Sequence, residues 1–179
     1  MEDPVSSGLL VLRIGLGVVF LAHGVKHLMG REKTTNWFGW LGFKAPGFQW
    51  FASTATELGV GVLLIVGALT GFAAAGVVGV MAVAFWTVHR KAGFFITAFM
   101  QDDVDVEGYE YVAVLALAAT AIAITGPGVY SIDDKVVIDG VSVASQLDGW
   151  VGLALAGVGA VLAGLLLAVF WRPGQSRQS

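Results

Sequence analysis

The sequence predicts an all-α membrane protein. We expect a four-helix transmembrane bundle, a fifth C-terminal transmembrane helix, and a small extracytoplasmic hairpin between the fourth and fifth helices. Of the 179 residues, 56% are hydrophobic and 13% are charged, whereas soluble domains have about 45–50% and about 25%. Five apolar stretches approach the roughly 20 residues that a helix needs to cross a bilayer. They do not alternate with a period of two residues, so helices are expected rather than strands.

The boundaries of the predicted helices follow from turn residues between the apolar stretches. An uncharged turn at 70–71 joins the second and third helices. The fourth is stopped by Gly126, Pro127 and Gly128, because proline lacks a backbone donor and glycine frees the chain. The acidic leader is unlike a signal peptide, so the first helix is expected to be retained. The predicted spans are 8–28, 51–69, 72–88, 109–125 and 150–171.

Basic residues predict the orientation. With five spans, the first loop, the third loop and the C-terminal tail lie on one side. Together with Lys26 at the adjoining end of the first helix, they hold eight of the ten Lys and Arg residues. The opposite side holds Lys135, and the remaining Arg13 lies within the first helix. Because loops rich in Lys and Arg stay in the cytoplasm, we expect an external N-terminus and a cytoplasmic C-terminus. Trp86 and Trp171 stand at or near helix ends, where indole rings favour the headgroup level.

Ionisable side chains within the predicted spans are the candidate functional residues, because they are costly in lipid. Counting inward from the first loop places Glu57 at the depth of His23. We therefore expect one polar cluster in one half of the bundle, formed by His23, His27, Glu57, His89, Tyr109 and Glu110. Imidazole, carboxyl and phenol groups could exchange protons with a quinone carbonyl. The alternative is a structural network in which Glu57 is hydrogen-bonded to His23 or Tyr109.

No metal site and no nucleic-acid surface are predicted. His23 and His27 share a helix face at spacing i, i+4, which can hold a metal, but Gly24 stands where the HExxH motif has glutamate. The chain has no cysteine, so thiolate chemistry and iron–sulfur ligation are excluded. The net charge is −3 and no basic run exceeds two residues, which excludes the usual electrostatic footprint of nucleic-acid binding.

The position of Arg13 within the first predicted helix allows two alternatives. Its side chain is expected to snorkel outward or to meet an acidic residue between the fourth and fifth helices.

Two further segments have a recognisable pattern. The apolar segment 93–100 is too short to span and is expected at the membrane interface, followed by a solvated acidic loop at 102–108. Asp139 and Gly140 lie between two runs of β-branched residues, which is a strong hairpin signal.

The last predicted helix carries a small residue at every fourth position, which allows close approach of another helix. This ladder has two open interpretations: packing within the same bundle, or docking of another subunit. Its members are Gly152, Ala156, Ala160 and Gly164.

A series of short motifs, taken in order, resembles the DoxX family of small bacterial membrane proteins. The motifs are LRIGLG at 12–17, FLAHGVK at 20–26, FGWLG at 38–42, ELGVG at 57–61, VH at 88–89, GFF at 93–95, GYEY at 108–111 and GPGVYSID at 126–133. The resemblance implies a four-helix core at 1–133 in the bacterial inner membrane. The hairpin loop at 134–149, and the fifth helix with its polar tail at 150–179, are expected as additions.

The resemblance implies little about activity, because family members are poorly defined. Some are linked to a thiosulfate:quinone oxidoreductase subunit, and a mycobacterial relative is linked to a membrane oxidoreductase assembly. Our first hypothesis is a non-catalytic accessory subunit of a respiratory, redox or lipid-transport complex, docking partners through the fifth helix and the hairpin. The alternative is a small quinone-linked oxidoreductase subunit that uses the polar cluster, with quinone as its one candidate cofactor. A minimal transporter ranks last, because no inverted repeat is evident.

Overall fold

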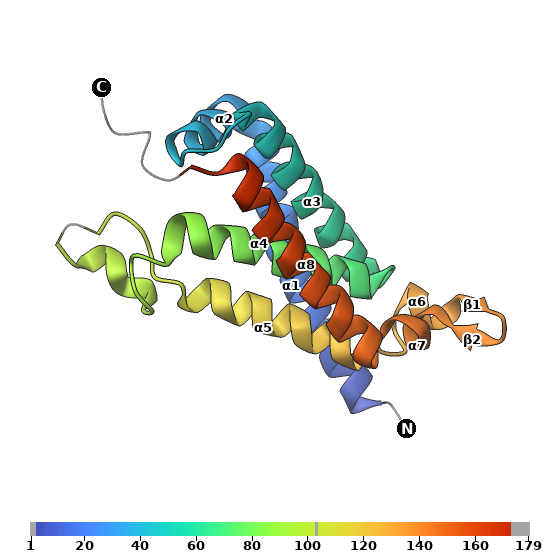
Figure 1. Ribbon diagram of the computed structural model, residues 1–179. Helices are drawn as coiled ribbons and strands as arrows, with labels where there is room; N and C mark the ends of the chain where they lie inside the picture. Colours follow the sequence, from blue (N-terminus) through green and yellow to red (C-terminus); the bar gives the residue numbers. More distant parts are fainter. Residues whose placement is uncertain (1–2, 103, 173–179) are drawn as a thin grey trace.

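The computed structural model describes residues 3–102 and 104–172, which are helical apart from one two-stranded hairpin and the connecting loops. The predicted polar tail at 173–179 and Asp103 of the acidic loop lie outside the described residues. Within the described part, four helices are long and apolar enough to cross a membrane. They are α1 (Pro4–Met29), α3 (Pro46–Val66), α4 (Thr70–Ala84) with its π-helical continuation η1 (Phe85–His89), and α8 (Gly149–Phe170) (Figure 1).

The helix α5 (Glu110–Thr125) is apolar but shorter than the other four. Its 16 residues extend about 24 Å, whereas the hydrocarbon core of a bilayer is about 30 Å thick. Four of the predicted spans are thus confirmed as helices of sufficient length, and a crossing by α5 stays a prediction. Between η1 and α5 the chain forms a loop with one short 3-10 helix, η2 (Ile96–Met100).

The helix α2 (Arg31–Trp40) lies where a loop was expected. Thr34 and Phe38, four residues apart, are its buried side chains. Phe38 packs edge-on against Phe43, with ring centroids 5.4 Å apart. The helix was missed because its ten residues are mostly polar and lack the apolar run that identifies a span.

Close approach through glycines positions α1 against α3, which run side by side in Figure 1. A Cβ atom added at Gly17 would lie 2.8 Å from the carbonyl oxygen of Gly61, and one at Gly24 would lie 2.8 Å from the side chain of Leu58. Neither position has room for a side chain. The core continues from α3 through α4 and α5, where Leu64, Val77 and Ile122 respectively are fully buried, and to α8, where Ala156 is buried.

Arg13 is fully buried in α1 and does not snorkel, so that half of the expectation was wrong. Its guanidinium donates to the carbonyl oxygens of Leu64 at 3.0 Å and Tyr130 at 2.7 Å. Asp133, an acidic residue between the fourth and fifth predicted helices, attracts Arg13 electrostatically, as the second alternative expected. It also accepts hydrogen bonds from the backbone N–H groups of Leu69 and Thr70 at the start of α4. A buried charge in an apolar interior requires such partners.

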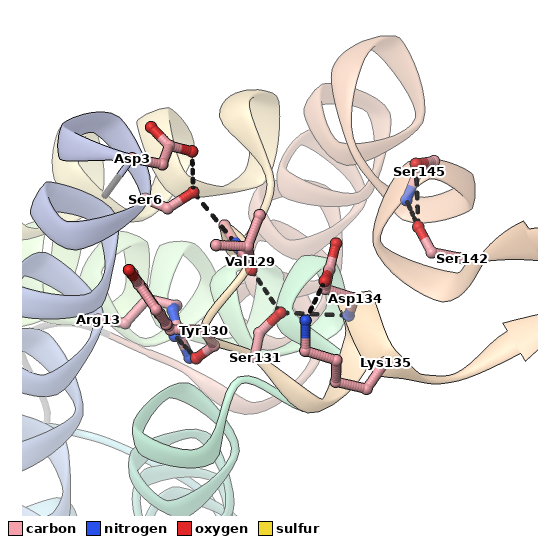
Figure 2. A network of polar contacts seen from close by, with 11 residues as sticks. Asp3, Ser6, Arg13, Val129, Tyr130, Ser131, Asp134, Lys135, Ser142 and Ser145 are labelled. Atoms are coloured by element: carbon pink, nitrogen blue, oxygen red, sulfur yellow. Dashed lines mark hydrogen bonds and ion pairs between the residues drawn. The ribbon is translucent and has the colours of Figure 1, made fainter. Parts of the chain in front are cut away.

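The loop after α5 is also fastened to the first turn of α1. Ser6 donates to the carboxylate of Asp3 and accepts from the backbone N–H of Val129, as Figure 2 shows. The hydrogen bond from Ser6 holds the pKa of Asp3 below its usual value. Two distant segments of the chain are thereby joined at the same end of the molecule as Arg13.

The predicted hairpin is confirmed. After α6 (Ile132–Lys135), the strands β1 (Val137–Ile138) and β2 (Val141–Ser142) pair antiparallel, with Ile138 opposite Val141. Asp139 and Gly140 both have positive φ values, 52° and 80°, as a tight two-residue turn requires. The short helix α7 (Val143–Leu147) then leads into α8, and the hairpin projects from the bundle in Figure 1.

Replacing Asp133 with Asn is expected to reduce the free energy of unfolding by about 1–3 kcal/mol, because a charged acceptor of two backbone donors becomes neutral. Thermal unfolding of the detergent-solubilised protein measures this effect. Asp139→Asn is the matched control, because Asp139 is exposed at a turn that accepts Asn. Equal melting temperatures for both variants and the unmodified protein would contradict the assigned role.

Candidate functional site

The closest contact between ionisable groups of two long helices is that of His27 on α1 with Glu57 on α3. The imidazole Nδ1 lies 2.8 Å from the carboxylate Oε2, and the two side chains are 20% and 6% exposed. Ser53, one turn earlier on α3, donates to the other carboxylate oxygen, Oε1, at 3.2 Å. The glycine-mediated approach of α1 to α3 explains why these two side chains meet.

The geometry of this pair leaves hydrogen-bonding capacity unused. Although Nδ1 of His27 and Oε2 of Glu57 are close, the hydrogen-bond angle at the ring N–H is unfavourable. Neither atom therefore has a well-directed hydrogen bond. Imidazole and carboxyl groups are common proton donors and acceptors in proteins. The arrangement therefore allows a proton to pass to a third polar group that approaches Nδ1 of His27 or Oε2 of Glu57.

Two further polar side chains of α3 are buried without a partner. Gln49 is 3% exposed and Thr54 is 4% exposed, and neither Nε2 of Gln49 nor Oγ1 of Thr54 has a hydrogen-bond partner. Thr54 precedes Glu57 by three residues, so the two lie close together on the helix surface. Buried polar groups are nearly always hydrogen-bonded. The unpaired hydroxyl of Thr54, near Glu57 and its neighbour His27, is therefore available to bind a polar group of a ligand.

Sequence reasoning missed Gln49, Ser53 and Thr54 because none of them is ionisable. A usable signal was present: Gln49, Ser53 and Glu57 follow one another at four-residue spacing, which draws a polar stripe along an otherwise apolar helix.

His23 does not contact Glu57. Its ring Nδ1 lies 2.9 Å from the carbonyl oxygen of Val19 in the same helix, and the side chain is exposed. The rings of His23 and His27 are 6.5 Å apart, edge to face. Glu57 therefore has His27 as its neighbour rather than His23 or Tyr109, because counting depth along a helix ignores its rotation.

The remaining members of the predicted cluster form a second group around the start of α5. His89 lies 2.7 Å from the carbonyl oxygen of Glu107, through Nδ1. The ring of Tyr109 packs edge-on against that of Phe94, and Glu110 accepts a hydrogen bond from the backbone N–H of Ile96. Within residues 3–102 and 104–172, no hydrogen bond or ion pair joins this group to His27 and Glu57. The single cluster expected from the sequence is thus two local groups.

The small-residue ladder of α8 divides between two environments. Gly152 and Ala156 are buried, and a Cβ atom at Gly152 would collide with the carbonyl of Ala123 in α5. Ala160 and Gly164 are exposed. A four-residue spacing drifts about 40° per step around a helix, so one such ladder cannot stay on one packed face. Docking of another subunit on the exposed half stays a prediction.

In the described part of the chain, no group of three or more His, Cys, Asp or Glu side chains could hold a metal ion. An open, mostly apolar hollow of about 570 Å³ lies at the opposite end, beside Tyr130. Its basic residue, Lys135, is paired with Asp134 at 2.9 Å.

Comparison with known proteins identifies the family. The DoxX family model matches residues 8–90. A protein of Bacillus subtilis (strain 168) named "Putative oxidoreductase CatD" is 30% identical over 133 residues, which cover 74% of this chain and 90% of that protein. The chain belongs to the DoxX family. No solved structure matches it. The segment matched by the DoxX model contains α1 to η1, and therefore both His27 and Glu57, whereas Tyr109 and Glu110 lie beyond it.

A double-mutant cycle tests which histidine Glu57 interacts with. His27→Gln combined with Glu57→Gln is expected to show a coupling of about 1–2 kcal/mol in the free energy of unfolding, because the two side chains are in contact. His23→Gln combined with Glu57→Gln is the matched control and should show less than about 0.5 kcal/mol. A larger coupling for His23 than for His27 would contradict the pairing.

Proposed function

We propose that this protein is the membrane-embedded, proton-handling subunit of a quinone-linked oxidoreductase. The observation that carries the proposal is the buried contact of His27 with Glu57, beside the unpartnered hydroxyl of Thr54. The relative from Bacillus subtilis, named a putative oxidoreductase, supports a redox role.

The chemistry of quinone reduction explains why such a pair is useful. A quinone takes up two electrons and two protons to give a quinol, and its carbonyl oxygens accept the protons. The chain has no cysteine, so we assign the electrons to a cofactor of a partner subunit, such as a flavin or an iron–sulfur cluster. The acyl region contains no free water to supply protons. In this proposal, the pair gives one proton to a quinone oxygen. It is then reprotonated by water at the membrane surface through His27, which is 20% exposed and lies in the last turn of α1, and gives the second proton.

The proposal includes the path of the chain through the membrane. We place α5 as a fifth, short crossing, the N-terminus outside and the C-terminus in the cytoplasm, according to the distribution of basic residues. The DoxX-like core then comprises residues 1–133, the external hairpin loop 134–149, and the added helix with its tail 150–179.

A non-catalytic accessory subunit is the second candidate function. The observation that favours it is unpartnered apolar surface on the added parts: Ile138 and Val141 of the hairpin are 51% and 46% exposed, and Ala160 and Gly164 face outward on α8. In this case the partner complex would contain the catalytic residues, and Glu57 would only stabilise the bundle.

Substitution of Glu57 distinguishes the two functions. Glu57→Gln keeps the shape of the side chain but cannot deliver a proton, so donor-dependent reduction of a short-chain quinone in membranes should fall about 100-fold or more. Quinone binding should persist, measured by quenching of the fluorescence of Trp50, whose indole N–H donates to the carbonyl of His27 at 2.9 Å. His27→Gln should also slow the reaction, and His23→Gln is the matched control on the same helix. If Glu57→Gln assembles normally and turns over at the unmodified rate, the catalytic role is excluded and the accessory role gains support.

A further inference from the structure

Arg90 is held between two indole rings at the end of the α4–η1 helix. Its guanidinium carbon lies 5.1 Å from the ring centroid of Trp86 and 5.9 Å from that of Trp171. Both distances are within the range of a cation–π interaction. The side chain of Arg90 is exposed, and that of Trp86 is 48% exposed.

The fold fixes each member of this arrangement. In the π-helical turn η1, the backbone N–H of Arg90 donates to the carbonyl of Phe85, five residues earlier. This wider turn carries Arg90 back over Trp86, four residues away. The other ring is also fixed, because the indole N–H of Trp171 donates to the carbonyl of Leu41 at 2.8 Å.

Two more basic residues flank the same indole. Phe43 pairs with Trp171 as an isolated bridge. In this bridge the backbone N–H of Lys44 donates to the carbonyl of Phe170, and that of Arg172 donates to the carbonyl of Gly42. The backbone of three basic residues from three separate segments is therefore fixed near Trp171. The guanidinium of Arg90 lies over the indole ring, whereas that of Arg172 donates through Nη1 to the carbonyls of Ala168 and Trp171 at 2.9 Å and has its other nitrogen, Nη2, for a ligand.

The position of these residues relative to the spans places them at one membrane surface. Arg90 directly follows the candidate span Thr70–His89, and Trp171 directly follows the span Gly149–Phe170. Lys44 stands two residues before the span Pro46–Val66. Residues at span ends lie at the level of the lipid headgroups, where tryptophan and arginine are favoured.

The three cations have no acidic partner among residues 3–102 and 104–172. The ion pairs in this part of the chain are His27–Glu57 and Lys135–Asp134. Lys44, Arg90 and Arg172 are all exposed. Like charges gathered at the edge of a membrane favour an anion between or beside them.

We propose that Lys44, Trp86, Arg90, Trp171 and Arg172 form a binding site for the phosphate group of an anionic phospholipid. The planar guanidinium of Arg90 can donate two parallel hydrogen bonds to phosphate oxygens, while the indoles keep it at headgroup level. Below the site, Leu165 and Val169 of α8 are each 57% exposed and offer an apolar surface for the acyl chains. This site does not depend on the proposed redox function, because none of its residues belongs to the His27–Glu57 pair.

Lipid titration of the full-length protein, followed by native mass spectrometry, tests the site. Phosphatidylglycerol is expected to bind more tightly than phosphatidylcholine. Arg90→Gln should reduce that preference about fivefold, the effect of removing one cation near an anionic headgroup. Lys91→Gln is the matched control: it removes the same charge at the next position, where no indole holds the side chain. If both variants lose the preference equally, the effect is general surface charge and the site is refuted.

Competition experiments distinguish a lipid phosphate from a soluble phosphate as the ligand. Glycerol 3-phosphate and inorganic phosphate, added alone, should not compete with the lipid at millimolar concentration. Competition by either would identify a soluble ligand and overturn the lipid assignment. Brominated phosphatidylglycerol should quench tryptophan fluorescence more than brominated phosphatidylcholine, and Arg90→Gln should abolish this difference. If Arg90→Gln fails to fold, the test uses Arg90→Lys, Lys44→Gln and Arg172→Gln instead. A weakened lipid preference in Lys44→Gln and Arg172→Gln supports the site, and an unchanged preference in both overturns it.

Discussion

The close contact between α1 and α3 determines where the buried side chains of Arg13 and Glu57 lie. Gly17, Gly24 and Gly61 let the two helices approach so closely that a methyl group at any of them would meet its neighbour. At one end of this contact the guanidinium of Arg13 reaches the carbonyl of Leu64 on α3, and at the other the imidazole of His27 reaches the carboxylate of Glu57. A larger residue at a glycine position would move both pairs at once, because packed helices shift as rigid elements.

The two ends differ in how their ionisable groups are held. At the end near the N-terminus, Arg13, Ser6 and Asp133 are joined by hydrogen bonds to the backbone of segments far away in sequence. These bonds fix the loop after α5 to α1 and to the start of α4, which is a structural role, although Nε of Arg13 and the hydroxyl of Thr70 have no partner there. At the opposite end, the contact between His27 and Glu57 itself has no well-directed hydrogen bond, and the hydroxyl of Thr54 beside them has none. Unpaired buried polar atoms are unfavourable for folding, and here they belong to groups that can exchange protons, so they indicate function more strongly than burial alone does.

Features that depend on local sequence could be predicted, and features that depend on helix rotation could not. Apolar length predicted the four long helices, and Asp139 with Gly140 predicted the hairpin turn. The order of motifs indicated the family, which the comparisons confirm. The neighbour of Glu57 was missed, because depth in the membrane is one coordinate and the angular position around α1 decides between His23 and His27. The π-helical turn was missed, and the sequence left two alternatives open for Arg13, for a related reason: both features are set by tertiary contacts with segments that have no local signal.

The end of the segment matched by the family model coincides with a structural junction. That segment ends at residue 90, and Arg90 is the residue whose guanidinium lies over Trp171, directly after α8. The bridge between Phe43 and Trp171 ties the same point of α8 to the loop before α3. The helix α8, which lies outside the matched segment, is therefore firmly packed. Its C-terminal end contacts two elements of that segment, and Gly152 near its N-terminal end packs against α5. Since the polar stripe of α3 begins at Gln49, shortly after this junction, a lipid phosphate bound at Arg90 would lie at the same end of the bundle as the His27–Glu57 pair.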